Sequence, residues 1–170
     1  MLVLIYLLST CLVGAYCQCP YGFDVIKNSN SNSNACYLIV EMSSTWIEAK
    51  QYCDVLGGDL AAFETEDEMS PVRKMLQEFL PEGESSFQMN FWVDGTDIIE
   101  KGKFYWMGKN GNQERVSYYK KSSNGQTDNA NLLSSCLELG SNRNFGMSDQ
   151  NCSMKQGFIC EASKYSDNEE

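Results

Sequence analysis

The sequence predicts a single α+β domain, and three observations lead to that prediction. Two helical patterns lie in the first half of the chain, between residues 45 and 83. Several short apolar or aromatic runs follow, separated by turn residues, which is typical of strands. Cysteines stand near both ends, and neither an internal repeat nor a Pro- or Gly-rich linker divides the 170 residues. Early helices followed by late strands indicate an α+β fold.

Residues 1–17 carry no charge and have the composition of a secretory signal peptide, with an apolar stretch followed by small residues. As a helix they would extend about 25 Å, which is less than the ~30 Å hydrocarbon core of a membrane. We therefore expect a secreted, extracellular protein without a membrane anchor. Cleavage after Ala15 would leave an odd number of cysteines, whereas cleavage after Cys17 leaves an even number, which favours Cys17. The predicted division is a signal peptide at 1–17, one domain at 18–162 and an acidic disordered tail at 163–170.

Charge and composition exclude several function classes. The formal net charge is −10 and no Lys/Arg-rich run offsets it, so a nucleic-acid partner is not expected. Histidine is absent, which excludes Ser-His-Asp and Cys-His catalysis and His-ligated zinc. A carboxylate pair could still perform glycosidase chemistry. We nevertheless expect a protein that is not an enzyme.

The first predicted helix begins at Thr45, because Thr45-Trp46-Ile47-Glu48 has the Thr-x-x-Glu form of a capping box. A predicted buried face follows at i, i+3, i+4 and i+7, and Gly57-Gly58 ends the helix. The residues of that face are Ala49, Tyr52, Cys53 and Leu56.

The second predicted helix begins at Ser70-Pro71, with proline at its favoured first position, and ends at Pro81-Glu82-Gly83. Its inner face contains Val72, Met75, Leu76 and Phe79. The later part of the chain, together with one run before the first helix, supplies the expected strands. They lie at residues 36–40, 91–93, 104–106, 116–119, 136–139 and 157–160.

Five motifs, in this order and at these spacings, resemble the C-type lectin-like domain over Cys19 to Glu161. They are GGDLA just after Cys53, FWVDG at 91–95, CLEL at 136–139, SDQNC at 148–152 and GFICE at 157–161. The resemblance implies a fold of two helices and a small antiparallel sheet, with a long loop region. It also implies a function in recognition, such as innate-immune recognition of microbial or self glycans.

Of the eight cysteines, six remain after cleavage at Cys17. These six allow fifteen pairings, and spacing alone does not choose among them. The resemblance implies three disulfides. One would join the first helix to the last strand and another would lie across the long-loop region, while the third would close an N-terminal hairpin of the family's longer form. The implied pairs are Cys53 with Cys160, Cys136 with Cys152, and Cys19 with Cys36.

In sugar-binding members of that family, a calcium ion in the long loop is shared between the protein and the sugar hydroxyls. The galactose-type Gln-Pro-Asp motif corresponds here to Gln126-Thr127-Asp128. The Trp-Asn-Asp motif corresponds to Met147-Ser148-Asp149, and Ser134 stands where the family has a Glu. This sequence therefore matches the family at three of its five calcium-ligand positions. They are Gln126, Asp128 and Asp149, to which Ser148 could add a hydroxyl.

Thr127 weakens the implied site, because the family's proline at this position is cis. A cis peptide before threonine would cost about 2.5–4 kcal/mol, so we expect a trans peptide that turns Gln126 and Asp128 apart. Calcium is thus a candidate cofactor that the sequence does not require, with galactose-type sugars as the expected ligands if it binds. The alternative is a calcium-independent module, which would bind a glycan through other loop surfaces or engage a protein partner, as an antagonist does, through the long-loop face.

Two further features have plain interpretations. Tyr118, Tyr119, Lys120 and Lys121 form a second candidate contact patch, although one tyrosine in the core and two solvated lysines would explain them equally. Asn151-Cys152-Ser153 is an N-glycosylation sequon. Its middle residue is an expected disulfide cysteine, which weakens the sequon as a signal.

Overall fold

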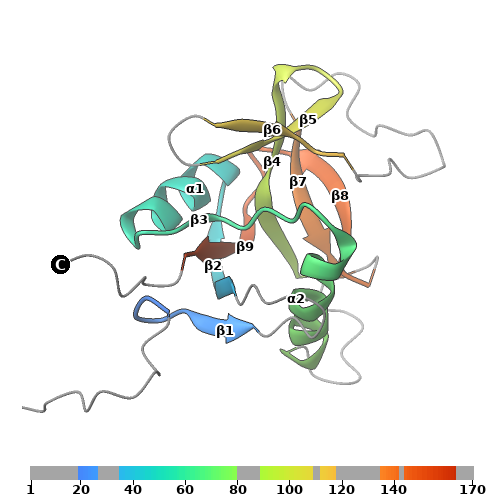
Figure 1. The fold of residues 1–170 in the computed structure, drawn as a ribbon. Coiled ribbons are helices and arrows are strands. Elements are labelled where there is room, and N and C mark those ends of the chain that lie inside the picture. The colour runs from blue at the N-terminus through green and yellow to red at the C-terminus, as the bar shows by residue number, and fades with distance from the viewer. Residues whose placement is uncertain are drawn as a thin grey trace, which may run out of the picture.

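The computed structural model describes residues 19–26, 35–79, 89–108, 112–117, 135–141 and 144–163. Two helices, α1 (Trp46–Val55) and α2 (Glu66–Phe79), lie at opposite sides of the sheet, and β5 and β6 lie at its upper end (Figure 1). The described strands are β1 (Asp24–Ile26), β2 (Ala35–Ser44), β3 (Asp59–Leu60), β4 (Asn90–Glu100), β5 (Lys103–Met107), β6 (Gln113–Arg115), β7 (Ser135–Gly140), β8 (Gly146–Asn151) and β9 (Gln156–Ala162).

All nine described strands belong to one sheet, in which β1-β2-β9-β4-β5-β6 form a continuous path. Strand β3 pairs with β9, while β7 pairs with both β4 and β8. Strands β4 and β9 run parallel, with Phe91 opposite Gly157 and Trp92 opposite Phe158. The other described pairs are antiparallel, so the sheet is mixed rather than wholly antiparallel. The predicted α+β fold with two helices is confirmed.

Helix α1 begins as the sequence predicts. The Thr45 N–H donates to Glu48 Oε2 at 2.8 Å, and the Glu48 N–H donates back to Thr45 Oγ1 at 3.4 Å, which completes the capping box. The predicted buried face is partly wrong. Tyr52 and Leu56 are 39% and 37% exposed, and Trp46, Ala49 and Cys53 are the residues that α1 buries. Trp46, in the first turn, is buried and reaches β4, where its Nε1 donates to Val93 O.

The predicted start of α2 is wrong, because the helix begins at Glu66, five residues before Pro71. The Glu68 N–H donates to Thr65 Oγ1 at 3.3 Å, so Thr65 caps the helix. Pro71 therefore lies inside the helix. Val72 and Leu76 are buried as predicted, while the predicted end at 81–83 lies outside the described residues.

The strand predictions fit best in the sheet interior. Strands β2, β4, β5, β7 and β9 contain the predicted runs, whereas β1, β3 and β8 were not predicted. The run at 116–119 is displaced, because β6 ends at Arg115 and Val116 follows it. Val116 is buried and donates its N–H to Phe104 O at 3.0 Å. Residues 118 and 119 lie outside the described part of the chain.

Three disulfides join the cysteine pairs that the resemblance implies: Cys19–Cys36, Cys53–Cys160 and Cys136–Cys152. The second of these ties α1 to β9. Two tryptophans fasten the same region, since Trp46 Nε1 donates to Val93 O and Trp92 Nε1 donates to Ser44 O, both at 2.9 Å. Helix α1 is thus held to the sheet by a disulfide and by the buried Trp46 hydrogen bond, while the Trp92 bond joins β4 to the end of β2.

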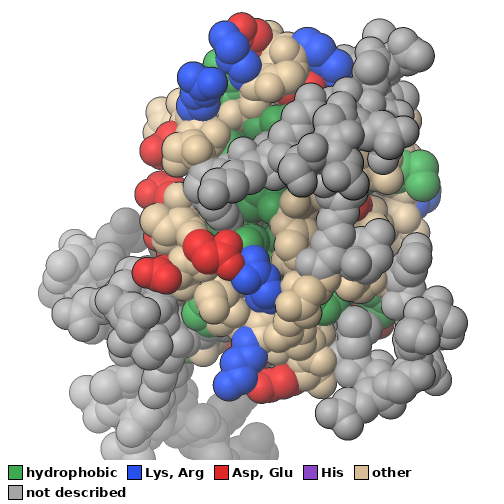
Figure 2. All heavy atoms as spheres, turned by 90° about the vertical axis from the view of Figure 1, so that its right-hand side faces the viewer, with side chains coloured by type: hydrophobic (Ala, Val, Ile, Leu, Met, Phe, Trp, Pro, Cys, Tyr) green, Lys and Arg blue, Asp and Glu red, His purple; other side chains and the backbone are tan. Residues whose placement is uncertain are grey.

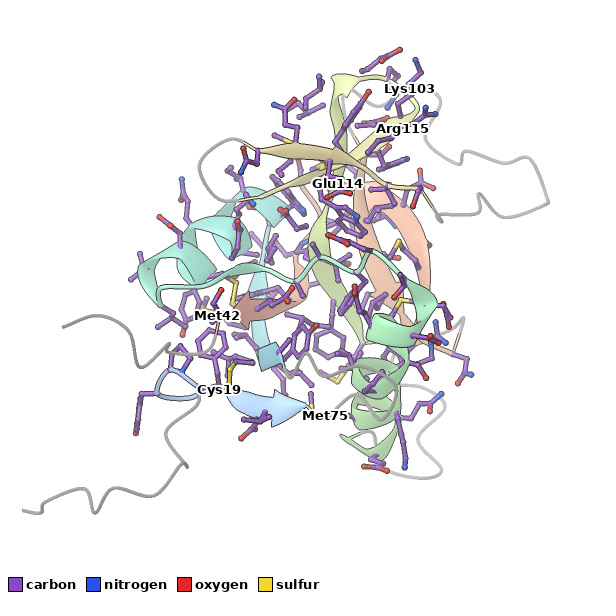
Figure 3. All side chains as sticks on the ribbon, in the orientation of Figure 1. Cys19, Met42, Met75, Lys103, Glu114 and Arg115 are labelled. Atoms are coloured by element: carbon purple, nitrogen blue, oxygen red, sulfur yellow. A yellow bond between two sulfur atoms is a disulfide. The ribbon has the colours of Figure 1, made fainter. Side chains whose placement is uncertain are left out.

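Basic side chains gather at the upper end of the molecule, where the β4–β5 hairpin and β6 lie (Figure 2). Lys103 and Arg115 occupy this end together (Figure 3). Lys101 and Lys103 each pair with a carboxylate, of Asp97 and Glu100 respectively, which offsets their charge. Within the described residues, no helix is long and apolar enough to cross a membrane.

Candidate functional site

The β7–β8 hairpin carries the predicted ligand positions that the structure describes. Strand β8 pairs antiparallel with β7, which places Ser148 opposite Glu138 and Asp149 opposite Leu137. Gln126 and Asp128 lie outside the described residues, as do Ser134 and the second candidate patch at 118–121. The structure therefore does not test whether Gln126 and Asp128 approach Asp149.

Ser148 is turned into the protein and bonded there. Its side chain is 4% exposed, and its hydroxyl donates to Glu138 Oε1 at 3.1 Å. Asn90, at the start of β4, donates through Nδ2 to both carboxylate oxygens of Glu138 at 3.3 Å. A buried carboxylate needs such donors, because burial without partners is costly. Ser148 therefore helps to satisfy Glu138 and is a poor candidate for a calcium ligand.

Sequence reasoning did not identify Asn90 and Glu138 as parts of this region. Glu138 is a charged residue between two leucines in the CLEL run, and all six residues of β7 are buried. A strand that is buried on both faces leaves no solvent for a carboxylate, so an internal partner could have been anticipated. Which residue would be that partner depends on the β4–β7 and β7–β8 pairings, which motif spacing does not reveal.

Asp149 projects from the opposite face of β8 from Ser148, because successive side chains of a strand alternate. It is half-buried, and the residue opposite it on β7, Leu137, is buried. A carboxylate here could accept hydrogen bonds from vicinal sugar hydroxyls or could bind a cation. Asp149 is thus the predicted ligand residue whose described environment fits either role.

A buried aspartate fixes the point at which the chain enters β7. Asp97 is 3% exposed, and its Oδ1 accepts from the Ser135 N–H at 2.7 Å. Its Oδ2 accepts from the Gly102 N–H at 3.0 Å and lies 3.3 Å from the Lys101 ammonium. The β4–β5 hairpin and the first residue of β7 are thereby joined through one carboxylate.

A second buried charge cluster lies between α1 and the sheet. The Lys50 ammonium is 2.6 Å from Asp59 Oδ1 and 2.6 Å from Asp94 Oδ1, and it also donates to Met107 O. Burial of the carboxyl raises the pKa of Asp94 to about 7, although the Lys50 ammonium acts in the opposite direction. The cluster joins α1 to β3, β4 and β5, so its first effect is on the fold.

Glu161, on β9, is a half-buried acid. It accepts from the Ala62 N–H at 3.2 Å, and burial raises its pKa to about 7, with a smaller contribution from nearby carboxylates such as Glu68. Burial also raises the pKa of the Tyr37 phenol, and the charge of Glu161 adds to this effect. The Glu161 carboxyl therefore stays protonated to a higher pH than an exposed glutamate does.

The described residues do not assemble a metal site on their own. In the described ranges, no group of three or more His, Cys, Asp or Glu side chains is arranged to hold a metal ion. Calcium prefers six to eight oxygen ligands. Asp149 suits such an ion, but Ser148 does not, because it is 4% exposed and its hydroxyl is turned toward Glu138 inside the protein. Calcium binding therefore stays a prediction that depends on Gln126 and Asp128.

Comparison with known proteins identifies the family. Residues 42–162 match the model of the lectin C-type domain. Perlucin from Haliotis laevigata is 33% identical over 144 residues, which cover 84% of this chain and 82% of perlucin. Salivary C-type lectin 1 from Aedes albopictus is 30% identical over 122 residues, covering 69% of this chain and 76% of that protein.

A solved structure supports the same fold. Human lithostathine superposes with a TM-score of 0.65 at 23% sequence identity, covering 85% of this chain and 99% of that chain. The family match covers both described helices in full and every strand from β3 to β9. The chain belongs to the C-type lectin domain family.

Proposed function

We propose that this protein is secreted and recognises a glycan through the Asp149 face of β8, without requiring calcium. The family is non-enzymatic, so binding rather than catalysis is the activity to explain. Three disulfides suit an oxidising, extracellular location. The single observation that carries the proposal is the orientation of the 148–149 pair, in which Ser148 is buried against Glu138 and Asp149 is directed to the other face.

A calcium ion and a sugar would make different demands on the side chains of the 148–149 pair. A calcium-centred site would use oxygens from both positions of the pair, but Ser148 is buried and its hydroxyl is turned inward toward Glu138. A direct site needs only hydrogen bonds, and one carboxylate can accept from two neighbouring sugar hydroxyls. Hydrogen bonds to a charged group contribute about 1.5–3 kcal/mol each. Asp149 thus supplies a strong contact without an ion.

The first experiment is binding of the secreted protein to a broad glycan array, with calcium and then with excess chelator. We expect glycan binding that persists in chelator. Binding that disappears with chelator would contradict the calcium-independent proposal and assign a working ion site to Gln126, Asp128 and Asp149. An absence of glycan binding in both conditions would contradict glycan recognition and favour a protein ligand.

A matched pair of variants tests the role of Asp149. Asp149→Asn removes the charge but keeps the size, and we expect it to weaken binding about 10- to 100-fold, as the loss of a charged hydrogen bond predicts. Asp54→Asn removes the same charge from an exposed position on α1 and serves as the control. Equal affinity of both variants and the parent protein would place the binding site elsewhere.

A further inference from the structure

The turn between β8 and β9 carries the chain's one N-glycosylation sequon, Asn151-Cys152-Ser153. Two hydrogen bonds define its conformation. The Met154 N–H donates to Asn151 O at 2.9 Å, which closes a four-residue turn. The Ser153 N–H donates to the side-chain Oδ1 of Asn151 at 3.0 Å. This second bond makes an Asx turn, in which the side chain of Asn151 is held by its own sequon.

The turn between β8 and β9 is exposed to solvent at the residues that follow Cys152. Ser153, Met154 and Lys155 are exposed, and Asn151 is half-buried. The carbonyl oxygen Oδ1 of Asn151 is occupied by the Ser153 N–H, which leaves the amide nitrogen Nδ2 as the other end of the side chain. Within the described residues, Nδ2 makes no hydrogen bond. Attachment of a group to Nδ2 therefore breaks no described interaction.

We propose that Asn151 is a site of N-linked glycosylation. The sugar donor would be a lipid pyrophosphate-linked oligosaccharide, as in the secretory pathway. A bond forms between Nδ2 of Asn151 and C1 of the first sugar, while the bond from that C1 to the pyrophosphate oxygen breaks. Nδ2 loses one proton, and the lipid pyrophosphate leaves with the electron pair. The proposal requires entry into the secretory pathway but is independent of the proposed glycan-binding function.

Cys152, in the middle of the sequon, limits when glycan transfer can occur. It does not prevent the folded turn from accommodating the attached glycan. Cys152 is bonded to Cys136, and its carbonyl accepts from the Trp46 N–H at 3.1 Å, so the folded turn is fastened on its inner side. A transferase that needs an extended substrate would act before this disulfide closes. Afterwards the glycan would lie on the exposed side of the turn. We therefore expect competition between glycan transfer and disulfide formation, and hence partial occupancy.

The position of the glycan would affect the neighbouring surface. Asn151 and Asp149 are two residues apart on β8, so their side chains share a face of the strand at a spacing of about 7 Å. A glycan on Asn151 would therefore lie beside Asp149 and would restrict the ligands that could approach it. Enzymatic removal of the glycan would increase access to that face.

The test is expression of the full chain in insect or vertebrate cells, with analysis of both the medium and the cell-associated pool. Each pool is compared by electrophoretic mobility and intact mass before and after treatment with a peptide N-glycanase. We expect a species that loses mass on treatment, with Asn151 converted to Asp in its peptide map. If neither pool contains such a species, the proposal is wrong.

Three variants locate the modification. Asn151→Asp keeps an oxygen to accept from the Ser153 N–H, and Ser153→Ala keeps the backbone N–H that donates, so both preserve the Asx turn. We expect both to abolish the glycanase-sensitive species. Asn112→Gln changes an exposed asparagine outside a sequon and should behave as the parent. A sensitive species that survives in Asn151→Asp would overturn the assignment, and this readout does not depend on folding because transfer precedes it.

Discussion

The Lys50 ammonium lies 2.6 Å from Asp94 Oδ1, and the Asp94 side chain is 1% exposed. The same ammonium contacts Asp59, so two carboxylates share one cation. It also lies 5.8 Å from the centre of the Trp46 ring, a cation–π distance. One lysine on α1 thus neutralises charge from two strands. The charges of Lys50, Asp59 and Asp94 sum to zero only when one of the two carboxyl groups is protonated.

This charge balance predicts that the free energy of unfolding falls as the pH rises. Burial raises the folded-state pKa of Asp94 from 3.8 to about 7 and that of Glu161 from 4.5 to about 7. Between these values the folded protein binds more protons than the unfolded chain, so stability decreases from about pH 4 to pH 7. Urea unfolding at pH 5, 6, 7 and 8 should show the midpoint falling and then levelling. Asp94→Asn should make that fall shallower, whereas a midpoint that rises with pH would contradict the assignment.

Removal of Lys50 should be strongly destabilising. Lys50→Met leaves the buried Asp94 carboxylate without its cation, and breaking a buried pair in this way costs about 3–5 kcal/mol. The control is Lys74→Met, because the Lys74–Glu78 pair is exposed and such pairs contribute about 0–1 kcal/mol. Chemical denaturation at pH 8 measures both. Equal losses in the two variants would mean that burial does not govern the Lys50 pair.

The double substitution separates charge from packing. Asp94→Asn in the Lys50→Met background removes the charge that would be left alone, so it should restore part of the lost stability. The coupling free energy between the two positions is obtained from the same denaturation curves. Additive effects of the two substitutions would show that Lys50 stabilises the fold through its aliphatic stem instead.

The capping box of α1 is open to a direct test. Thr45→Ala removes the oxygen that accepts from the Glu48 N–H, and loss of such a cap costs about 0.5–2 kcal/mol. Thr45→Ser keeps the hydroxyl and should cost much less. Thermal unfolding of the two variants compares them. If serine and alanine destabilised α1 equally, the hydroxyl would have no part in capping.

The parallel contact between β4 and β9 depends on the absence of a side chain at Gly157. A Cβ at this position would lie 2.8 Å from Phe91 Cδ1 and 2.9 Å from Val40 O, and a backbone atom cannot yield easily. Gly157→Ala should therefore destabilise the fold by about 1–3 kcal/mol.

Gly108→Ala is the matched control for Gly157→Ala, because the nearest atom to its added Cβ, Asn112 O, is 3.4 Å away. We expect its stability to stay within about 0.5 kcal/mol of the parent. The urea unfolding midpoints of the two variants measure this difference in stability. Similar midpoints would mean that β9 can shift to accept a methyl group.

The sequence predicts local features of this fold more reliably than long-range ones. The Thr45–Glu48 box was predicted correctly because both hydrogen bonds join residues three apart. The start of α2 was missed although Thr65 and Glu68 show the same Thr-x-x-Glu form, because Pro71 suggested a later start. The helical periodicity placed Ala49 and Cys53 correctly on the buried face of α1. It could not show which positions of the helix the sheet covers, so it wrongly included Tyr52 and Leu56.

The candidate site was less accessible to sequence reasoning for a physical reason. The disulfide pairs were implied by family resemblance and are confirmed, yet the partners of the buried acids are not short-range. Lys50 and Asp94 are 44 residues apart, and Glu138 and Asn90 are 48 apart. These contacts exist only after the strands have paired in one register. Motif matching therefore identified position 148 but not the carboxylate to which its hydroxyl donates.

The Cys53–Cys160 disulfide has a consequence for limited proteolysis. It spans 107 residues, so any single cut of the backbone between these cysteines leaves the two pieces covalently joined. Nicked protein would keep the mass of the intact chain, plus one water, until a reducing agent is added. Electrophoresis without reduction would then report an undamaged molecule, and only reduced samples would reveal two fragments. Protease resistance of this domain should accordingly be judged after reduction.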